Sequence, residues 1–310
     1  MTPQRGHSGP STRGASQRGQ VAAGGTTRPS YVTRALAVSS AQRWWRGRGP
    51  GSSSIHVPMP DATTRFTDRV DDYVRFRPTY PESLLEWLRT AHGVVPSWVV
   101  ADVGAGTGIS ARLFLDGGHP VVAIEPNAAM RAAAVAQLGA RAGFRAVDGT
   151  AEATGLPDAS VELVSVAQAF HWFDGEAARR EWRRILRPGG LAAIYWNSRR
   201  VAGTPFLAGY EALLHRFGTD YAAVAERYAD EPTMRRWFGA GFLGTARFDH
   251  RQRLDLEGLR GRLLSSSYAP RAGDPRHAPM LEALRDLFVA TASDGAVDFD
   301  YDTRVYVGRL

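Results

Sequence analysis

Glycines stand at alternate positions, Gly104, Gly106 and Gly108, directly after the short apolar run 98–103 and before a helical pattern. Glycine lets the backbone turn tightly and approach a ligand without a clash from a Cβ atom. The N–H groups of the following helix then point into the same crevice, at the carboxyl ends of the strands. The spacing therefore predicts a ligand-binding turn. A dinucleotide-binding turn favours a further glycine at position 109, where this chain has Ile109.

Two acidic residues accompany this turn. Glu125 closes the next apolar run, 121–125, and a carboxylate at a strand end there can accept both hydroxyls of a ribose. The alternative for Glu125 is a solvated acid at a strand end. Asp102 stands just before the glycines; it either caps the turn or helps to hold the ammonium group of a ligand.

His171 is the candidate general base, because the reference pKa of histidine lies near neutrality. The alternative is a packed or cofactor-contacting side chain, since Trp172 and Phe173 follow it. The eight histidines are dispersed without a metal-ligand spacing, so we expect no metal site. The sequence also has no cysteine and no nucleophile elbow, which excludes the familiar patterns of nucleophilic catalysis.

Strand and helix patterns alternate between Pro81 and Trp196, with short connections. The expected strands are 98–103, 121–125, 144–147, 161–167 and 191–196; the expected helices begin at 81–83 and cover 109–115, 128–138 and 176–186, the last stopping at Pro188-Gly189-Gly190. This alternation is typical of a parallel sheet covered by helices on both faces. We therefore predict an α/β fold.

The pattern changes after Asn197. Helices are expected at 206–217, 221–228, 233–238, 256–264 and 280–290, and strands at 246–254 and 303–307. No internal repeat is visible. We predict one domain, 59–310, with 198–242 and 255–295 as helical cap or insertion segments.

The basic charge belongs to the N-terminal segment. The net charge is +7, and every one of the 38 basic residues is arginine. Eight arginines and no acidic residue precede position 61, which leaves 30 arginines against 31 acidic residues in the remainder. Residues 1–58 have the Gly, Ser, Pro and Arg content of a disordered tail. An arm that touches acidic partners, a transit peptide and a misassigned start before Met59 all remain open for this segment.

The remaining composition limits the class of protein. No apolar run approaches the length of about 18 residues that a membrane-spanning helix needs, so we expect no membrane partner. The absence of cysteine excludes disulfides and is compatible with a cytoplasmic location. The balanced charge of 61–310 argues against nucleic-acid binding by the folded part.

The ordered motifs resemble those of the class I S-adenosylmethionine-dependent methyltransferases, near the ubiquinone/menaquinone-type and trans-aconitate-type enzymes. The glycine turn resembles the family's first motif, Glu125 its ribose acid, and 186–190 its turn before the fifth strand. Segment 167–173 resembles the part that borders cofactor and acceptor, and 72–81 resembles a lid before the first helix. The similarity covers about 65–200.

The resemblance implies a Rossmann-like, seven-stranded and mostly parallel sheet, with helices on both faces and a helical insertion before the last strands. It also implies S-adenosylmethionine as cofactor and a small-molecule methyl acceptor. The implied cofactor-binding residues are Tyr73, Arg77, Asp102, Gly104, Ala105, Gly106, Gly108, Glu125, Pro126, Thr150, Ala151 and Gln168. Tyr73 would cover the sulfonium with its ring, and Arg77 would pair with a carboxylate of the cofactor or acceptor. Core packing and a surface ion pair are their structural alternatives.

The chain departs from the family after the third strand. An acidic residue there often reads the adenine amino group, but this chain has Thr150. Asp148 stands two residues earlier and Glu152 two residues later. Adenine recognition through Thr150 and the Ala151 backbone, or through Asp148, stays open.

Three classes of function follow. The leading one is a methyltransferase that acts on O, N or C of a small molecule. The second is a nicotinamide- or flavin-dependent oxidoreductase, which Ile109 disfavours. The third is a nucleic-acid methylase or a non-catalytic cofactor-binding protein. The charge balance disfavours it, as does the absence of an Asn/Asp-Pro-Pro-aromatic tetrapeptide after the fourth expected strand. The sequence specifies neither the acceptor nor the oligomeric state.

Overall fold

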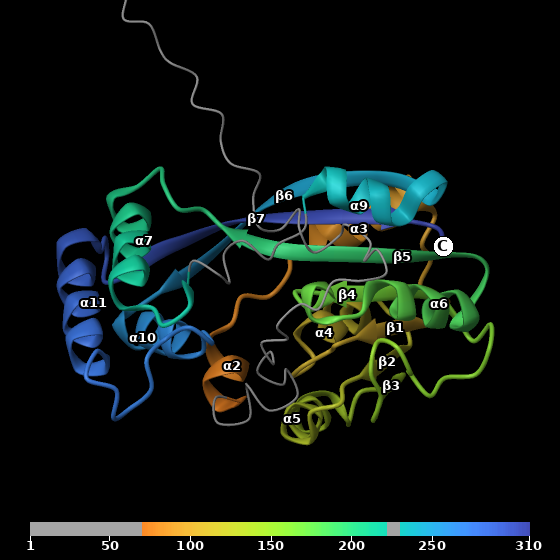
Figure 1. Cartoon of the computed structure of the whole chain (residues 1–310), viewed down its shortest axis with the longest axis horizontal. Coiled ribbons are helices and arrows are strands. Elements are labelled where there is room, and N and C mark those ends of the chain that lie inside the picture. Colours follow the sequence, from red (N-terminus) through yellow and green to blue (C-terminus); the bar gives the residue numbers. More distant parts are fainter. Residues whose placement is uncertain (1–69, 222–229) are drawn as a thin grey trace, which may run out of the picture. The chain divides into compact units, whose positions relative to one another are not determined.

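The computed structural model describes residues 70–221 and 230–310 (Figure 1). The predicted tail, 1–58, and most of the helix predicted at 221–228 lie outside the described residues. Within the described ranges, no helix is long and apolar enough to cross a membrane.

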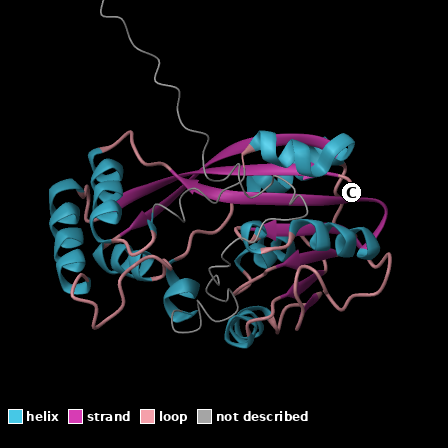
Figure 2. Ribbon diagram, in the orientation of Figure 1, coloured by secondary structure: helices cyan, strands magenta, loops and turns pink. Residues whose placement is uncertain are grey.

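The central element of the fold is one seven-stranded sheet (Figure 2). In spatial order its strands are β3 (Phe144–Val147), β2 (Val121–Ile124), β1 (Val100–Val103), β4 (Val161–Ala167), β5 (Leu186–Arg199), β7 (Val297–Gly308) and β6 (Phe242–Leu254). Strands β1 to β5 pair in parallel, whereas β7 runs antiparallel to both β5 and β6. The predicted mostly parallel, seven-stranded α/β fold is confirmed.

Helices cover both faces because the central strands are buried on both sides. Every residue of β1 and β2 is buried, as expected for strands at the centre of a parallel sheet. On one face the core includes Leu88 of α3 (Glu82–His92), Phe114 of α4 (Ile109–Asp116) and Leu138 of α5 (Ala128–Leu138). On the other face it includes Trp182 of α6 (Gly175–Ile185) and Trp237 of α9 (Glu231–Phe238).

Strand β5 differs from the prediction at its start. We expected a helix that stops at Pro188-Gly189-Gly190 and a strand that begins at 191, but α6 ends at Ile185 and β5 begins at Leu186. The cause is strand pairing. Leu186 pairs with Val161 and Leu191 pairs with Leu163, so the intervening residues form an irregularity inside an extended chain.

The remaining helices do not form one group. Apolar side chains of α7 (Pro205–Phe217), α10 (Leu256–Leu264) and α11 (His277–Thr291) pack together with the start of β7. Helix α9 instead packs beside α6 on the sheet, although it lies in the same predicted cap segment, 198–242. The role of 198–242 and 255–295 as a cap stays a prediction.

Helix α2 (Val70–Phe76) links the C-terminal helices to the carboxyl edge of the sheet. It packs against α10 and α5. The carbonyl of Phe76 accepts a hydrogen bond from Gln252 Nε2 at 3.0 Å. The Phe76 ring fills the space beside Gly261, where an added Cβ would lie 2.1 Å from it. The predicted lid segment therefore lies against two parts of the chain that are distant in sequence.

Candidate functional site

The glycine turn after β1 is fixed by the neighbouring strand. The N–H groups of Gly104 and Ala105 both donate to the Ile124 carbonyl, at 2.9 and 3.1 Å. Gly104, Gly106 and Gly108 have φ angles of 69°, 56° and 86°. These angles lie in the left-handed region that residues with a Cβ adopt at a cost. The predicted turn is present, and the local backbone requires glycine.

The three glycines of the turn differ in how much space a Cβ atom would have beside them. A Cβ on Gly104 would lie 2.7 Å from Ala169 Cβ, and one on Gly108 would lie 2.7 Å from Leu138 Cδ1. These two glycines therefore allow close packing within the protein. A Cβ on Gly106 would meet nothing within 4 Å. Gly106 is thus the position in the turn that leaves room for a ligand.

Glu125 lies directly beside Gly106. Its Oε2 accepts a hydrogen bond from Gly106 N at 2.8 Å, and its Oε1 accepts one from Asn127 N at 2.9 Å. The side chain is buried, with Glu125 only 9% exposed. Burial raises the pKa of this carboxyl, and the two backbone hydrogen bonds oppose that rise. A carboxylate offers about four lone-pair sites, so acceptor capacity remains for a ligand hydroxyl.

Arg131 and Asn127 position this carboxylate, and the sequence analysis did not single them out. Arg131 donates to the carbonyls of Glu125 and Pro126, at 2.6 and 3.1 Å, and pairs with Asp148 at 3.2 Å. Asn127 Oδ1 accepts from the N–H groups at the start of α5. An asparagine before a helical pattern is an N-cap signal that could have identified Asn127. No comparable signal marks Arg131.

The loop after β3 brings Thr150 and Ala151 to the same edge of the sheet. Thr150 Oγ1 accepts a hydrogen bond from Ala153 N at 3.2 Å. Ala151 is buried, and its carbonyl accepts from Trp182 Nε1 at 3.0 Å. The two acids beside this site have partners of their own, since Asp148 pairs with Arg131 and Glu152 accepts from Asp174 N.

Asp102 lies inside the protein beneath the turn. It is 0% exposed, and its carboxylate accepts from Ser110 Oγ at 2.6 Å and from Ser165 Oγ at 3.2 Å. The hydroxyl groups of Ser165 and Tyr195 are hydrogen-bonded at 2.9 Å. Burial raises the pKa of Asp102 to about 6, against the effect of these hydrogen bonds. Its observed contacts are those of a residue that supports the turn.

Tyr73 and Arg77 reach the same region from α2 and the residue after it. The Arg77 guanidinium lies 4.8 Å from the centre of the Tyr73 ring and donates to the Ser265 carbonyl at 2.8 Å. Burial raises the pKa of Tyr80 well above its usual value, and Tyr73, Asp102 and Arg77 all act on that hydroxyl electrostatically. Segments far apart in the sequence thus meet near Tyr80.

Gln168 and His171 follow β4. Gln168 has a left-handed φ of 60°, and its N–H donates to the Tyr195 carbonyl at 3.0 Å. Its Nε2 donates to the carbonyl of Asn197 at 3.2 Å. His171 lies in the 3-10 helix η2 (Phe170–Trp172), with its ring 4.9 Å from the Trp172 ring. Both residues follow the carboxyl end of β4, and their roles stay predictions.

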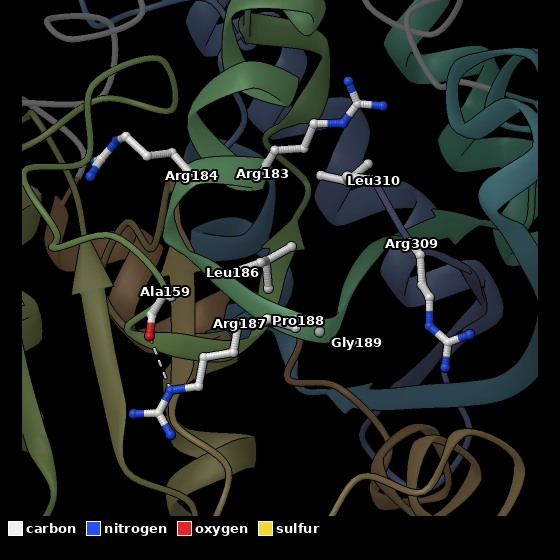
Figure 3. A pocket seen from close by; sticks show the side chains of 10 residues that line it. Ala159, Arg183, Arg184, Leu186, Arg187, Pro188, Gly189, Arg309 and Leu310 are labelled. Carbon is white, nitrogen blue, oxygen red and sulfur yellow. Dashed lines mark hydrogen bonds between the residues drawn. The ribbon is translucent and has the colours of Figure 1, made fainter.

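A cavity of about 520 Å³ opens at the opposite edge of the sheet (Figure 3). Arg183, Arg184, Arg187 and Arg309 line it, around the residues that connect α6 to β5. Figure 3 shows these guanidinium groups pointing away from one another rather than toward a common centre. The cavity contains none of the predicted site residues, which lie at the carboxyl ends of the strands.

Comparisons with known proteins agree with this arrangement. Residues 101–194 match a family described as "Methyltransferase domain". An uncharacterized methyltransferase of Mycobacterium tuberculosis (strain H37Rv) is 40% identical over 139 residues, which are 45% of this chain and 54% of that protein. A methyltransferase-like protein of Schizosaccharomyces pombe is 32% identical over 164 residues, 52% of this chain and 61% of that protein. The chain thus spans about half the length of the curated relatives it matches.

Solved structures share the fold. A putative type II methyltransferase from Anaeromyxobacter dehalogenans is 26% identical, with a TM-score of 0.57 over 76% of this chain and 98% of that chain. A putative methyltransferase from Anabaena variabilis, 21% identical, has a TM-score of 0.53 over 76% and 99% of the two chains. With the matches above, these likenesses support the resemblance seen in the sequence: residues 101–194 match a methyltransferase domain, and the described residues share the fold of solved methyltransferases.

Proposed function

We propose that this protein transfers the methyl group of S-adenosylmethionine to a small-molecule acceptor. The observation that carries the proposal is the contact between Glu125 and Gly106. It places a carboxylate with spare acceptor capacity next to the glycine of the turn that faces open space. A ribose can use both features, because its hydroxyls donate hydrogen bonds to the carboxylate while its ring lies close to the glycine backbone.

The described residues fit the cofactor along the edge formed by β1, β2 and β3. Glu125 would accept the ribose hydroxyls, while Gly104, Ala105 and Gly106 would leave backbone space for the ligand. Thr150 and the Ala151 backbone would border the adenine, because Asp148 is engaged by Arg131. Gly108 would keep α4 close to α5.

The other end of the cofactor would lie toward α2. Arg77 would pair with the methionine carboxylate, since it has a buried Nε without a hydrogen-bond partner and no carboxylate partner among the described residues. Asp102 would act from beneath, by holding Ser110 and Ser165. The Arg77 guanidinium already lies over the Tyr73 ring. A sulfonium contact with Tyr73 would therefore use another part of the tyrosine side chain.

The bound cofactor supplies a sulfonium methyl group that an acceptor atom displaces in line. The chain's own contribution is alignment, which Gln168 and the segment after β4 would provide at the acceptor side. A general base is needed only when the acceptor carries a proton that must leave. We keep His171 as the candidate for that step.

A thermal unfolding measurement on the full chain tests the proposal. S-adenosylhomocysteine at about 100 times its Kd should stabilise the protein by roughly 2.7 kcal/mol, a rise in Tm on the order of 5–10 °C for a protein near this size. The same concentration of NAD should have no effect. Glu125→Ala should abolish the rise. Glu152→Ala is the matched control, because the Glu152 carboxylate accepts a hydrogen bond from Asp174 N and does not contact Gly106. This variant should show the same rise in Tm as the wild type. A shift with NAD alone, or with neither ligand, would contradict the proposal.

A further inference from the structure

A group of polar side chains lies buried where α7 and α10 meet β5 and β7. We call Arg199, Tyr210, Glu211, Tyr221, Arg262 and Tyr301 the arginine cluster. Two guanidinium groups and one carboxylate belong to it. The proposed cofactor site uses none of these residues.

Arg199 and Glu211 satisfy each other within this cluster. Arg199 Nη2 forms an ion pair with Glu211 Oε2. The Tyr221 hydroxyl donates to the same carboxylate oxygen at 2.6 Å and accepts from Arg199 at 2.8 Å. Burial opposes ionisation of Glu211, but these partners leave its pKa below its usual value. This pair is therefore neutral overall and needs no further counterion.

Arg262 has no such partner among residues 70–221 and 230–310. It is only 6% exposed, and its Nε and Nη1 donate to the Tyr301 hydroxyl and Ser266 Oγ, at 3.2 and 3.1 Å. No carboxylate in the described ranges bonds to it. A guanidinium has five N–H donors, so donors remain. A buried charge without a counterion is costly, and the cost is offset when an anion binds beside it.

The hydroxyl of Tyr210 is the second unsatisfied group. Tyr210 is 1% exposed, and its oxygen has no hydrogen-bond partner within the part of the chain that the structure describes. Burial raises the pKa of this phenol, so it remains a protonated donor at neutral pH. Arg262 and Arg199 both act on this hydroxyl electrostatically, and the Arg199 guanidinium lies 5.2 Å from the centre of the Tyr210 ring. A buried cation and a buried phenol hydroxyl thus lie near each other.

The cluster adjoins the carboxyl edge of the sheet. Arg199 ends β5, two residues after Asn197, whose carbonyl accepts from Gln168. Asn197 Nδ2 donates to the Thr79 carbonyl at 2.8 Å, which holds the segment after α2 to the sheet. Arg262 follows Gly261, the residue that packs against Phe76. The buried cation is therefore close in the fold to the segments that border the proposed cofactor site.

We propose that the methyl acceptor carries a carboxylate, which binds Arg262 and the hydroxyl of Tyr210. The proposal rests on the methyltransferase function proposed above. One excess positive charge in the cluster matches a singly charged carboxylate. A phosphate, at about −1.5 to −2, would exceed it. The planar fork of a guanidinium also fits the two oxygens of a carboxylate.

The test uses the full chain saturated with S-adenosylhomocysteine and calorimetric titration at constant ionic strength. The probes are pairs of a sodium carboxylate and its neutral amide: acetate to hexanoate, benzoate, phenylacetate and succinate. We expect at least one acid to bind about tenfold or more tightly than its amide, as charge-assisted hydrogen bonds would give. Sodium phosphate should bind more weakly than that acid.

Two variants assign the binding to the cluster. Tyr210→Phe removes only an unpartnered hydroxyl, so the Tm without a carboxylate should not fall, while carboxylate affinity should drop about tenfold. Arg262→Met should abolish carboxylate binding. Tyr306→Phe, in β7 outside the cluster, should leave affinity unchanged.

Equal binding of acids and amides across the panel would overturn the proposal, as would a preference for phosphate or full carboxylate affinity in Tyr210→Phe. Absence of any carboxylate binding would also overturn it. S-adenosylhomocysteine binding is measured in each sample. If the wild-type chain does not bind S-adenosylhomocysteine, the proposed function is contradicted. If it binds S-adenosylhomocysteine but no carboxylate, only the proposed acceptor class is contradicted.

Discussion

The Glu125 carboxylate accepts a hydrogen bond from the backbone N–H of Gly106 at 2.8 Å. The two residues meet because β1 and β2 are parallel neighbours, with Val103 opposite Ile124. The carboxyl ends of both strands therefore lie side by side at the same edge of the sheet. Glu125 and the open glycine of the turn are hydrogen-bonded to each other, and changes at either residue should affect cofactor binding.

Alanine at Gly104 and at Gly106 should fail for different reasons. Gly106→Ala should fold with a stability loss of about 1 kcal/mol, the cost of a left-handed alanine, because its Cβ meets no atom within 4 Å. Its methyl group should lower S-adenosylhomocysteine affinity at least tenfold. Gly104→Ala should lose several times more stability, since its Cβ would lie 2.7 Å from Ala169 Cβ. Urea unfolding and calorimetry separate the effects. Equal stability losses would contradict this assignment.

Asp102→Asn should make stability less dependent on pH. Burial raises the folded-state pKa of Asp102 from 3.8 to about 6. The stability that its neutral form contributes is present below about pH 4 and is lost as pH rises through about 6. Asparagine stays neutral at all these pH values. Between pH 4 and pH 7.5, the free energy of unfolding of the variant should therefore rise relative to that of the wild type by up to about 3 kcal/mol. Urea unfolding across that range measures the gain. A constant difference between the two proteins would show that Asp102 does not titrate in this range.

Arg131→Met should weaken cofactor binding without unfolding the protein. The guanidinium links the carbonyls of Glu125 and Pro126 to Asp148, and its loss should release the loop that carries Glu125. We expect a drop in S-adenosylhomocysteine affinity of roughly three- to tenfold, as for the loss of one or two hydrogen bonds. Arg112→Met, which removes an exposed contact with Gln137, is the control. Equal affinity of Arg131→Met and Arg112→Met for S-adenosylhomocysteine would contradict this prediction.

His171→Gln tests the general base once an acceptor is known. If His171 removes the acceptor proton, kcat should fall about 100-fold or more, and the wild-type rate should rise with pH through the histidine pKa. S-adenosylhomocysteine affinity should change little. Unimpaired methyl transfer by the variant would assign His171 to packing beside Trp172.

The sequence predicted those elements whose signals are local. The expected ranges 128–138, 144–147, 161–167 and 256–264 agree with α5, β3, β4 and α10. Each has either an apolar run or a helical period of its own. The glycine turn and the place of Glu125 at a strand end also follow from local signals, because the backbone conformation there requires glycine and the acid directly follows β2. Their role in cofactor binding stays a prediction.

Tertiary structure decided what depends on partners distant in the chain. β5 and β7 extend beyond their predicted ranges because their backbone groups pair along most of their length. The packing of α9 beside α6, rather than with α7, depends on which apolar faces meet. Arg262 looks like any other arginine in the sequence, and only folding buries it where none of the described acids bonds to it. Composition and periodicity record the preferences of neighbouring residues, whereas burial and pairing are decided by contacts that form when distant segments pack.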